Sequence, residues 1–174
     1  MRKSILFYEL VGIAFIVIVG SMLHFTFELS GHNLIVGIFS AVNESVWEHL
    51  KLAFWPALLY AILERKYIRS SSFWLAKAVG IYLMPLAIAV FFYSYTAVLG
   101  ESVLIIDILI FVMAVVIGQM ASYRLLKLKL PERLERIALV VLIVLGVAFL
   151  VFTFYPPELF VFRDGLTGEY GILG

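Results

Sequence analysis

Cysteine is absent from the 174-residue chain. This absence excludes a disulfide framework, a thiol nucleophile and a metal site built on thiolates. Charge is also scarce, because Asp, Glu, Lys and Arg together make up 14% of the residues, whereas 64% are hydrophobic. Soluble domains are about 45–50% apolar and about 25% charged. The apolar excess is more than a small globule can bury, and it indicates an integral membrane protein in a lipid bilayer.

Common catalytic motifs are missing as well. The sequence has no H-E-x-x-H zinc motif, no G-x-S-x-G hydrolase motif and no phosphate-binding glycine loop. It contains no internal repeat and no low-complexity segment, so we expect a single domain over residues 1–174. We expect no nucleic-acid partner.

Five apolar segments are each long enough to cross a bilayer. They contain roughly 22–25 residues, or about 33–37 Å of helix, against a hydrocarbon core of ~30 Å. Helices are expected because backbone polar groups must be satisfied within the segment where water is absent. The predicted fold is therefore all-α, a polytopic membrane bundle of five helices, with spans at about residues 4–28, 44–67, 71–95, 102–126 and 131–155.

The first span could be mistaken for a signal peptide, because Met1-Arg-Lys-Ser precedes its apolar run. The run from Ile5 to about Phe27 is longer than a signal-peptide core of roughly 7–15 residues, and no cleavage site of small residues follows it. We therefore expect a retained first helix.

Lysine and arginine are distributed unevenly. All of them except Lys51 and Arg163 lie before the first span, between or just inside the second and third spans, or between or just inside the fourth and fifth spans. The positive-inside rule therefore predicts a multi-pass cell-membrane protein with its N-terminus inside and its C-terminus outside. All three histidines then lie on the outer side.

Polar side chains are concentrated at this outer boundary. His24 and Glu28 are four residues apart on the first helix and share a face. On the second helix, Glu44, Glu48 and Lys51 are expected to share a face, whereas His49 points about 100° away from Glu48. Polar groups near a membrane interior are costly, so the cluster predicts a functional site.

Local signals give part of this cluster a structural interpretation. Ser45-Val-Trp-Glu48 fits a helix-capping box, with Asn43 as a rival N-cap two residues earlier. Lys51 and Asp107 lie at similar depths on the second and fourth spans, and an ion pair between them is expected.

Two histidines with carboxylates can hold a divalent metal such as zinc. We predict an outward-facing pocket between the first, second and fourth spans that binds a small ligand or a divalent metal, with His24, Glu28 and His49 as the metal ligands. If the protein is an enzyme, the expected chemistry is metal-dependent hydrolysis of a lipid-like substrate. The catalytic residues would be Glu48, as base, and Lys51; the ligand-binding residues would be Asn43, Glu44, Asp107 and Arg163.

Two other interpretations fit the same residues. In the first, the protein is a non-catalytic transporter component or assembly partner, and the polar side chains form a structural hydrogen-bond network. In the second, it is a channel, for which a small five-helix chain would need to form a homodimer.

Glu9, Lys77 and Gln119 also lie within spans. Glu9 and Lys77 are each a few residues from the cytoplasmic end of a span, and we expect them to form a structural ion pair. Gln119 is flanked by Gly118 and Ser122, which predicts a role in helix packing.

The tail, residues 156–174, begins with Pro156-Pro157, which ends the fifth helix. Asp164-Gly165 and Thr167-Gly168 are turn signals. They predict a short turn or hairpin that packs over the outer cluster as a lid; the alternative is a mobile terminus.

Three segments resemble a known family: His24-Phe-Thr-Phe-Glu28, Val42-Asn-Glu-Ser-Val-Trp-Glu-His-Leu-Lys51 and Phe162-Arg-Asp-Gly-Leu-Thr-Gly-Glu-Tyr-Gly171. They are similar to small bacterial and archaeal membrane proteins that are catalogued as a domain of unknown function. The resemblance covers nearly the whole chain, and N-E-S-x-W-E-H-x-K is its most specific part. It implies a multi-helix membrane fold and supplies no activity, substrate or cofactor.

Overall fold

The computed structural model describes residues 4–172, and these residues are helical with connecting turns. Its elements are α1 (Ile5–Leu29), α2 (Leu34–Gly37), α3 (Val46–Glu64), α4 (Phe73–Leu99), α5 (Leu104–Leu125), α6 (Glu132–Phe154) and the 3-10 turn η1 (Phe160–Phe162). Within residues 4–172 the only β pairing is an isolated bridge between Arg163 and Tyr170. The prediction of an all-helical chain is confirmed. Arg2 and Lys3, which contributed to the predicted orientation, and the last two residues of the tail lie outside the described residues.

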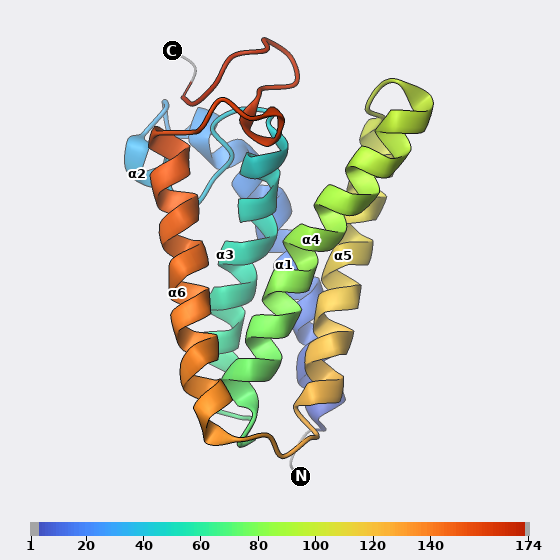
Figure 1. The fold of residues 1–174 in the computed structure, drawn as a ribbon, viewed down its shortest axis with the longest axis vertical. Coiled ribbons are helices and arrows are strands. Elements are labelled where there is room, and N and C mark those ends of the chain that lie inside the picture. The colour runs from blue at the N-terminus through green and yellow to red at the C-terminus, as the bar shows by residue number, and fades with distance from the viewer. Residues whose placement is uncertain (1–3, 173–174) are drawn as a thin grey trace.

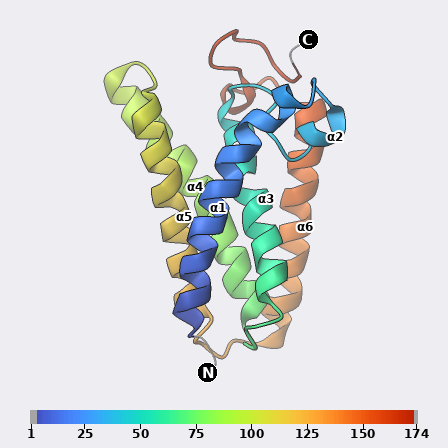
Figure 2. The same cartoon turned by 180° about the vertical axis from the view of Figure 1, so that it is seen from behind.

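Helix α3 lies at the centre of the bundle and contacts α1, α4 and α6. Helices α4 and α5 lie side by side and diverge from the other helices towards one end, which we call the outer end (Figure 1). The tail after α6 lies across the tips of α1, α3 and α6 at this end. Figure 2 shows that α1 begins at the opposite end, which we call the inner end, and runs along the face of the bundle formed with α3 and α5.

Four helices are long and apolar enough to cross a membrane: α1, α4, α5 and α6. Their outward faces expose large apolar side chains, such as Ile18 (59% exposed), Leu109 (61%) and Ile143 (64%). An apolar surface of this extent is typical of protein that faces lipid or a partner.

The segment predicted as the second span corresponds to α3, which is not among these four helices. It has 19 residues and carries Glu48, Lys51 and Glu64, all of them buried. A helix that packs against several neighbours can carry charged groups on its buried side, because the neighbouring helices supply partners for them.

Close helix packing depends on glycine. A Cβ atom built on Gly118 of α5 would lie 2.5 Å from the carbonyl oxygen of Gly80, and one built on Gly80 of α4 would lie 2.6 Å from that of Gly118. Backbone atoms cannot move aside as a flexible side chain can. The two glycines therefore set the distance between α4 and α5, as small residues commonly do between membrane helices.

We expect Gly118→Ala to destabilise the protein by about 1–3 kcal/mol, because the added methyl group overpacks the α4–α5 contact. The matched control is Gly146→Ala in α6, where the nearest atoms to a built Cβ are 3.5 Å away, an ordinary contact distance. Thermal unfolding in detergent should show a lower Tm for the first variant and an unchanged or higher Tm for the second. Equal stability of both variants would contradict the close α4–α5 contact.

Candidate functional site

Two histidines from different helices meet at the outer end. His24 lies in the last turns of α1 and His49 in the first turn of α3. Their Nε2 atoms are 3.2 Å apart, and their ring centroids are 5.1 Å apart. Because the α1–α3 contact runs along both helices, it holds these two side chains together.

A carboxylate from the connecting segment completes the group. Glu44 Oε2 lies 3.4 Å from His49 Nε2 and 3.7 Å from His24 Nε2. The expectation that Glu44 shares a helical face with Glu48 is wrong, because α3 begins only at Val46. Ser45 is the N-cap and has extended backbone angles, so Glu44 is outside the helix and free of its periodicity. Its side chain can therefore turn towards the histidines.

The three atoms have a spacing that suits a metal ion. His24, Glu44 and His49 each offer one ligand atom, and all three atoms lie within 4.8 Å of one another. From the three separations, the point equidistant from the atoms is about 2.0 Å from each. Zinc binds imidazole nitrogen at about 2.0–2.1 Å and carboxylate oxygen at about 2.0–2.2 Å. The donor set and its dimensions therefore fit a divalent transition metal.

The second nitrogen of His49 is also suitably placed. Its Nδ1 lies 2.8 Å from the carbonyl oxygen of Ser45. A carbonyl can only accept, so Nδ1 carries a hydrogen and donates it. In the neutral ring, Nε2 is then left with a free lone pair directed at the group. Metal-binding histidines characteristically donate their other N–H to a backbone carbonyl or carboxylate in this way.

The group is open to a cavity. The side chains of His24, His49 and Glu44 are 30%, 33% and 42% exposed. A cavity of about 340 Å³ lies beside them, between the end of α1, the segment before α3 and the tail. A second cavity of about 430 Å³ lies between the outer end of α4 and the tail. Glu44 lines both cavities, together with Asp164, Leu166 and Thr167.

Glu28 and His32 lie near this group but outside it. Glu28, the acid that the sequence paired with the histidines, lines the smaller cavity, and the three-residue group contains Glu44 in its place. His32 is exposed, adopts a positive φ of 61° and stacks on Phe27 with ring centroids 5.1 Å apart. These two residues provide matched comparisons for Glu44 and for the two histidines.

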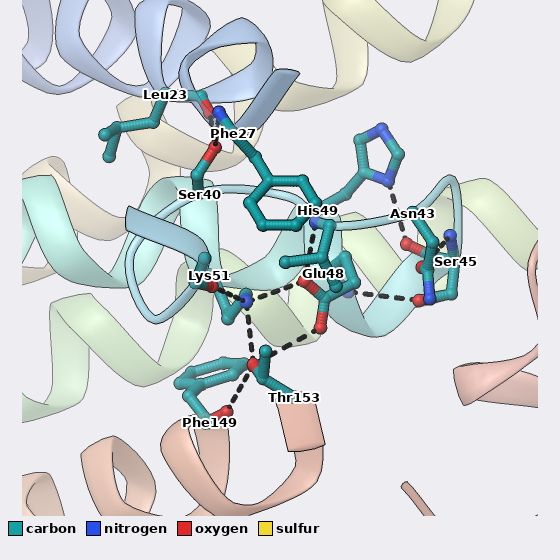
Figure 3. A network of polar contacts seen from close by, with 12 residues as sticks. Leu23, Phe27, Ser40, Asn43, Ser45, Glu48, His49, Lys51, Phe149 and Thr153 are labelled. Carbon is teal, nitrogen blue, oxygen red and sulfur yellow. Dashed lines mark hydrogen bonds and ion pairs between the residues drawn. The ribbon is translucent and has the colours of Figure 1, made fainter. Parts of the chain in front are cut away.

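Glu48 and Lys51 form a separate, buried network. Lys51 Nζ lies 2.6 Å from Glu48 Oε2 and donates to the Thr153 hydroxyl of α6 (2.7 Å) and to the Gly37 carbonyl of α2 (2.9 Å). Figure 3 shows these side chains converging between α3 and α6. Glu48 also accepts from the Val42 amide at 3.0 Å. Because Lys51 is 0% and Glu48 2% exposed, the arrangement is that of a structural ion pair.

The expected ion pair between Lys51 and Asp107 does not form among the described residues. Lys51 pairs with Glu48 instead, and Asp107 accepts a hydrogen bond from the Tyr95 hydroxyl, near the tips of α4 and α5. Those tips diverge from the rest of the bundle (Figure 1), and Asp107 belongs neither to the three-residue group nor to the lining of the smaller cavity. The fourth predicted span therefore contributes no lining residue to the smaller cavity.

The tail is tied to the segment before α3. Asn43 Nδ2 donates to the Gly171 carbonyl at 2.8 Å, and the Glu44 amide donates to Asp164 Oδ2 at 2.7 Å. The ring of Phe162 lies 4.7 Å from that of Trp47 in α3, measured between ring centroids.

Arg163 of the tail is exposed, lines the larger cavity and donates to the Gly168 carbonyl at 3.2 Å. The tail thus covers both cavities.

Asp164 organises this tail and was not among the predicted site residues. Its other oxygen, Oδ1, accepts from the amides of Leu166 (2.8 Å) and Thr167 (2.6 Å) and from the Thr167 hydroxyl (3.0 Å). Burial alone would raise the pKa of Asp164, but the hydrogen bonds from Thr167, Glu44 and Leu166 outweigh it and hold that pKa below its ordinary value of 3.8. The Asp164-Gly165 turn signal in the sequence pointed to this position.

The fold and site together define an all-helical protein with four membrane-length helices and a half-exposed His/Glu group beneath a C-terminal tail. A family model described as "Family of unknown function (DUF6512)" matches residues 2–172, and the chain belongs to this family. The resemblance to a family of unknown function is therefore confirmed. No curated protein and no solved structure gives a significant match. Any function must consequently be argued from the site.

We expect Asp164→Asn to loosen the tail, because a neutral amide oxygen accepts the converging backbone amides more weakly than a carboxylate does. Hydrogen exchange should be faster at Glu44, Leu166 and Thr167 in this variant. Since folding lowers the pKa of Asp164, its contribution is complete above about pH 5 and is lost as the pH falls below 3.8 and through the lower folded value. A tail whose exchange is unaffected by the substitution would contradict this role.

We expect Lys51→Met to destabilise the protein by about 3–5 kcal/mol, because it leaves the Glu48 carboxylate buried without its partner. Combining it with Glu48→Gln removes the stranded charge and should restore much of the loss. Denaturant unfolding in detergent measures both effects. If Lys51 served catalysis alone, Lys51→Met would leave stability unchanged.

Proposed function

We propose that this protein is a multi-pass cell-membrane protein in which α3 is a fifth span, packed against α1, α4 and α6. The basic connectors at the inner end then face the cytoplasm, and the tail and the His/Glu group face outward. Two features support this arrangement. Helix α3 runs alongside α1, α4 and α6, and its charged side chains are all buried.

We infer that His24, Glu44 and His49 bind one divalent transition metal of the zinc class. The single observation that carries this proposal is the point about 2.0 Å from all three ligand atoms. The hydrogen bond from His49 Nδ1 to Ser45 fixes the tautomer that this binding needs.

Held by His24, Glu44 and His49, such a metal would keep a position open for water and would supply the activation of that water for hydrolysis. Hydrolysis of a lipid-like substrate is the enzymatic reaction that this geometry favours.

Glu28 lines the adjoining cavity and is placed to accept a proton there. Glu48 is buried and is not placed to do so. The larger cavity offers Phe92 and Phe160 to an apolar chain and Arg163 to an anionic group.

A non-catalytic role is the alternative, and one distance favours it. The 3.2 Å separation of the two Nε2 atoms also fits a direct hydrogen bond between His24 and His49. In that case the cluster is a structural network, as expected of a transporter component or an assembly partner. The two roles differ in whether a metal stabilises the protein.

Elemental analysis and thermal unfolding of the purified protein test the metal site. We expect one equivalent of metal, and a gain of about 2.7 kcal/mol in unfolding free energy when zinc is present at 100 times its Kd. His24→Ala and His49→Ala should lose both the metal and this stabilisation. Glu44→Gln should weaken binding, because the amide oxygen is neutral.

The matched controls are His32→Ala and Glu28→Gln. Both residues lie at the same end of the molecule, outside the three-residue group, and both variants should retain the metal. Loss of metal in Glu28→Gln but not in Glu44→Gln would replace Glu44 with Glu28 as ligand. A wild-type protein that binds no zinc, with stability unchanged in His24→Ala and His49→Ala, would reject the site.

A further inference from the structure

A second buried charge cluster lies towards the inner end of the bundle. Glu9 of α1 is 0% exposed, Glu64 of α3 is 2% and Lys77 of α4 is 2%. Lys77 Nζ lies 2.6 Å from Glu9 Oε1 and also contacts Glu64 Oε2. The predicted pair of Glu9 and Lys77 is therefore confirmed, with Glu64 as an additional member.

In the part of the chain that the structure describes, the cluster contains two carboxyl groups but only one ammonium. Helix α5 adds Ser122 and Gln119, which are uncharged. Tyr60 of α3 is near both acids, but its hydroxyl donates to the Tyr8 carbonyl and is not available to them. With both carboxyls ionised, the buried cluster would carry one uncompensated negative charge. An unpaired charge in such surroundings is costly enough that the group takes up a proton instead.

Arg65, a further cation next to Glu64 in the sequence, is engaged in other contacts. Arg65 follows Glu64 directly, but its side chain donates to the Ile68 carbonyl at 3.1 Å and lies over the Phe73 ring, with Cζ 5.2 Å from the ring centroid. Among the described residues, the ion pairs of Glu9 and Glu64 are both with Lys77. Within residues 4–172, no second cation therefore forms an ion pair with the second acid.

Glu9 and Glu64 differ in how well a negative charge is stabilised. Glu9 Oε1 accepts from Lys77 and, at 3.1 Å, from the Ser122 hydroxyl. Among the described residues, Glu64 forms an ion pair with Lys77, but neither of its oxygens accepts a hydrogen bond. Glu64 is also the last residue of α3. The negative end of the helix dipole disfavours an anion there.

We propose that this cluster is a proton-binding site, in which Glu64 carries one exchangeable proton beside the Glu9–Lys77 ion pair. The neutral Glu64 side chain leaves a single balanced ion pair at the junction of α1, α3 and α4. Deprotonation at higher pH adds a negative charge next to Glu9 and weakens the contact between α3 and α1. The site is at the opposite end from the His/Glu group and does not depend on the metal proposal.

Infrared spectroscopy of the wild-type protein in detergent tests the proposal. A protonated carboxyl group gives a C=O stretching band that carboxylates lack, and the band shifts to lower frequency in D₂O. We expect this band at neutral pH, where exposed acids are ionised, and we expect it to disappear at high pH. Absence of the band from wild-type protein at neutral pH would overturn the proposal without any variant.

Substitutions identify the carboxyl group that gives rise to this C=O stretching band. Glu64→Gln should remove it, and Glu9→Gln should remove it as well, because Glu64 then ionises against Lys77 alone. Lys77→Met should roughly double it, since both acids become neutral. The control Glu158→Gln, at an exposed acid of the tail, should leave it unchanged. A band that persists in folded Glu64→Gln or Glu9→Gln protein would place the proton elsewhere and overturn the proposal.

Thermal unfolding provides a second readout. Glutamine has the shape of a neutral glutamate, so Glu64→Gln should keep the wild-type Tm, whereas Glu9→Gln should lower it. A greater loss of Tm in Glu64→Gln than in Glu9→Gln would show that Glu64 is the ionised partner and would reject its assignment.

Discussion

The outer end of the molecule depends on the buried ion pair between Lys51 and Glu48. The Lys51 ammonium ties α3 to α6 through Thr153 and to α2 through the Gly37 carbonyl. Glu48 holds the Val42 amide, and so fixes the segment that leads into α3. That segment carries Glu44, whose backbone amide binds the tail and whose side chain faces the histidines. The position of the candidate metal ligands therefore follows from a charge pair that water cannot reach.

The two ends of the bundle satisfy one constraint in different ways. Charges enclosed by apolar helices need partners, because low polarity makes an unpaired charge costly. At the outer end one ammonium faces one carboxylate, and the side chains of His24, Glu44 and His49 are partly exposed beside cavities. At the inner end one ammonium faces two carboxylates in a fully buried place. The first arrangement favours a fixed scaffold beside an open site, and the second favours uptake of a proton.

Part of the site could be predicted from helical periodicity. His24 and His49 were expected to act together, and the α1–α3 contact brings their Nε2 atoms to 3.2 Å. The Ser45 cap was also expected, and the Glu48 amide donates to its hydroxyl at 3.4 Å. The Lys51–Asp107 pair was wrong, because depth in a span does not determine which helices are neighbours. Glu44 was wrongly assigned to the helical face of Glu48, because it precedes the first turn of α3.

The sequence by itself determined that the chain forms long apolar helices, where they begin and end within a few residues, and which polar residues are too deep to be free of partners. These properties follow from local composition and spacing. Tertiary structure alone decided the partners: Glu44 rather than Glu28 beside the histidines, Glu48 rather than Asp107 beside Lys51, and Glu64 as the second acid on Lys77. Each of these choices depends on how helices far apart in the chain rotate and approach, and on side chains in non-helical segments, which no helical repeat describes.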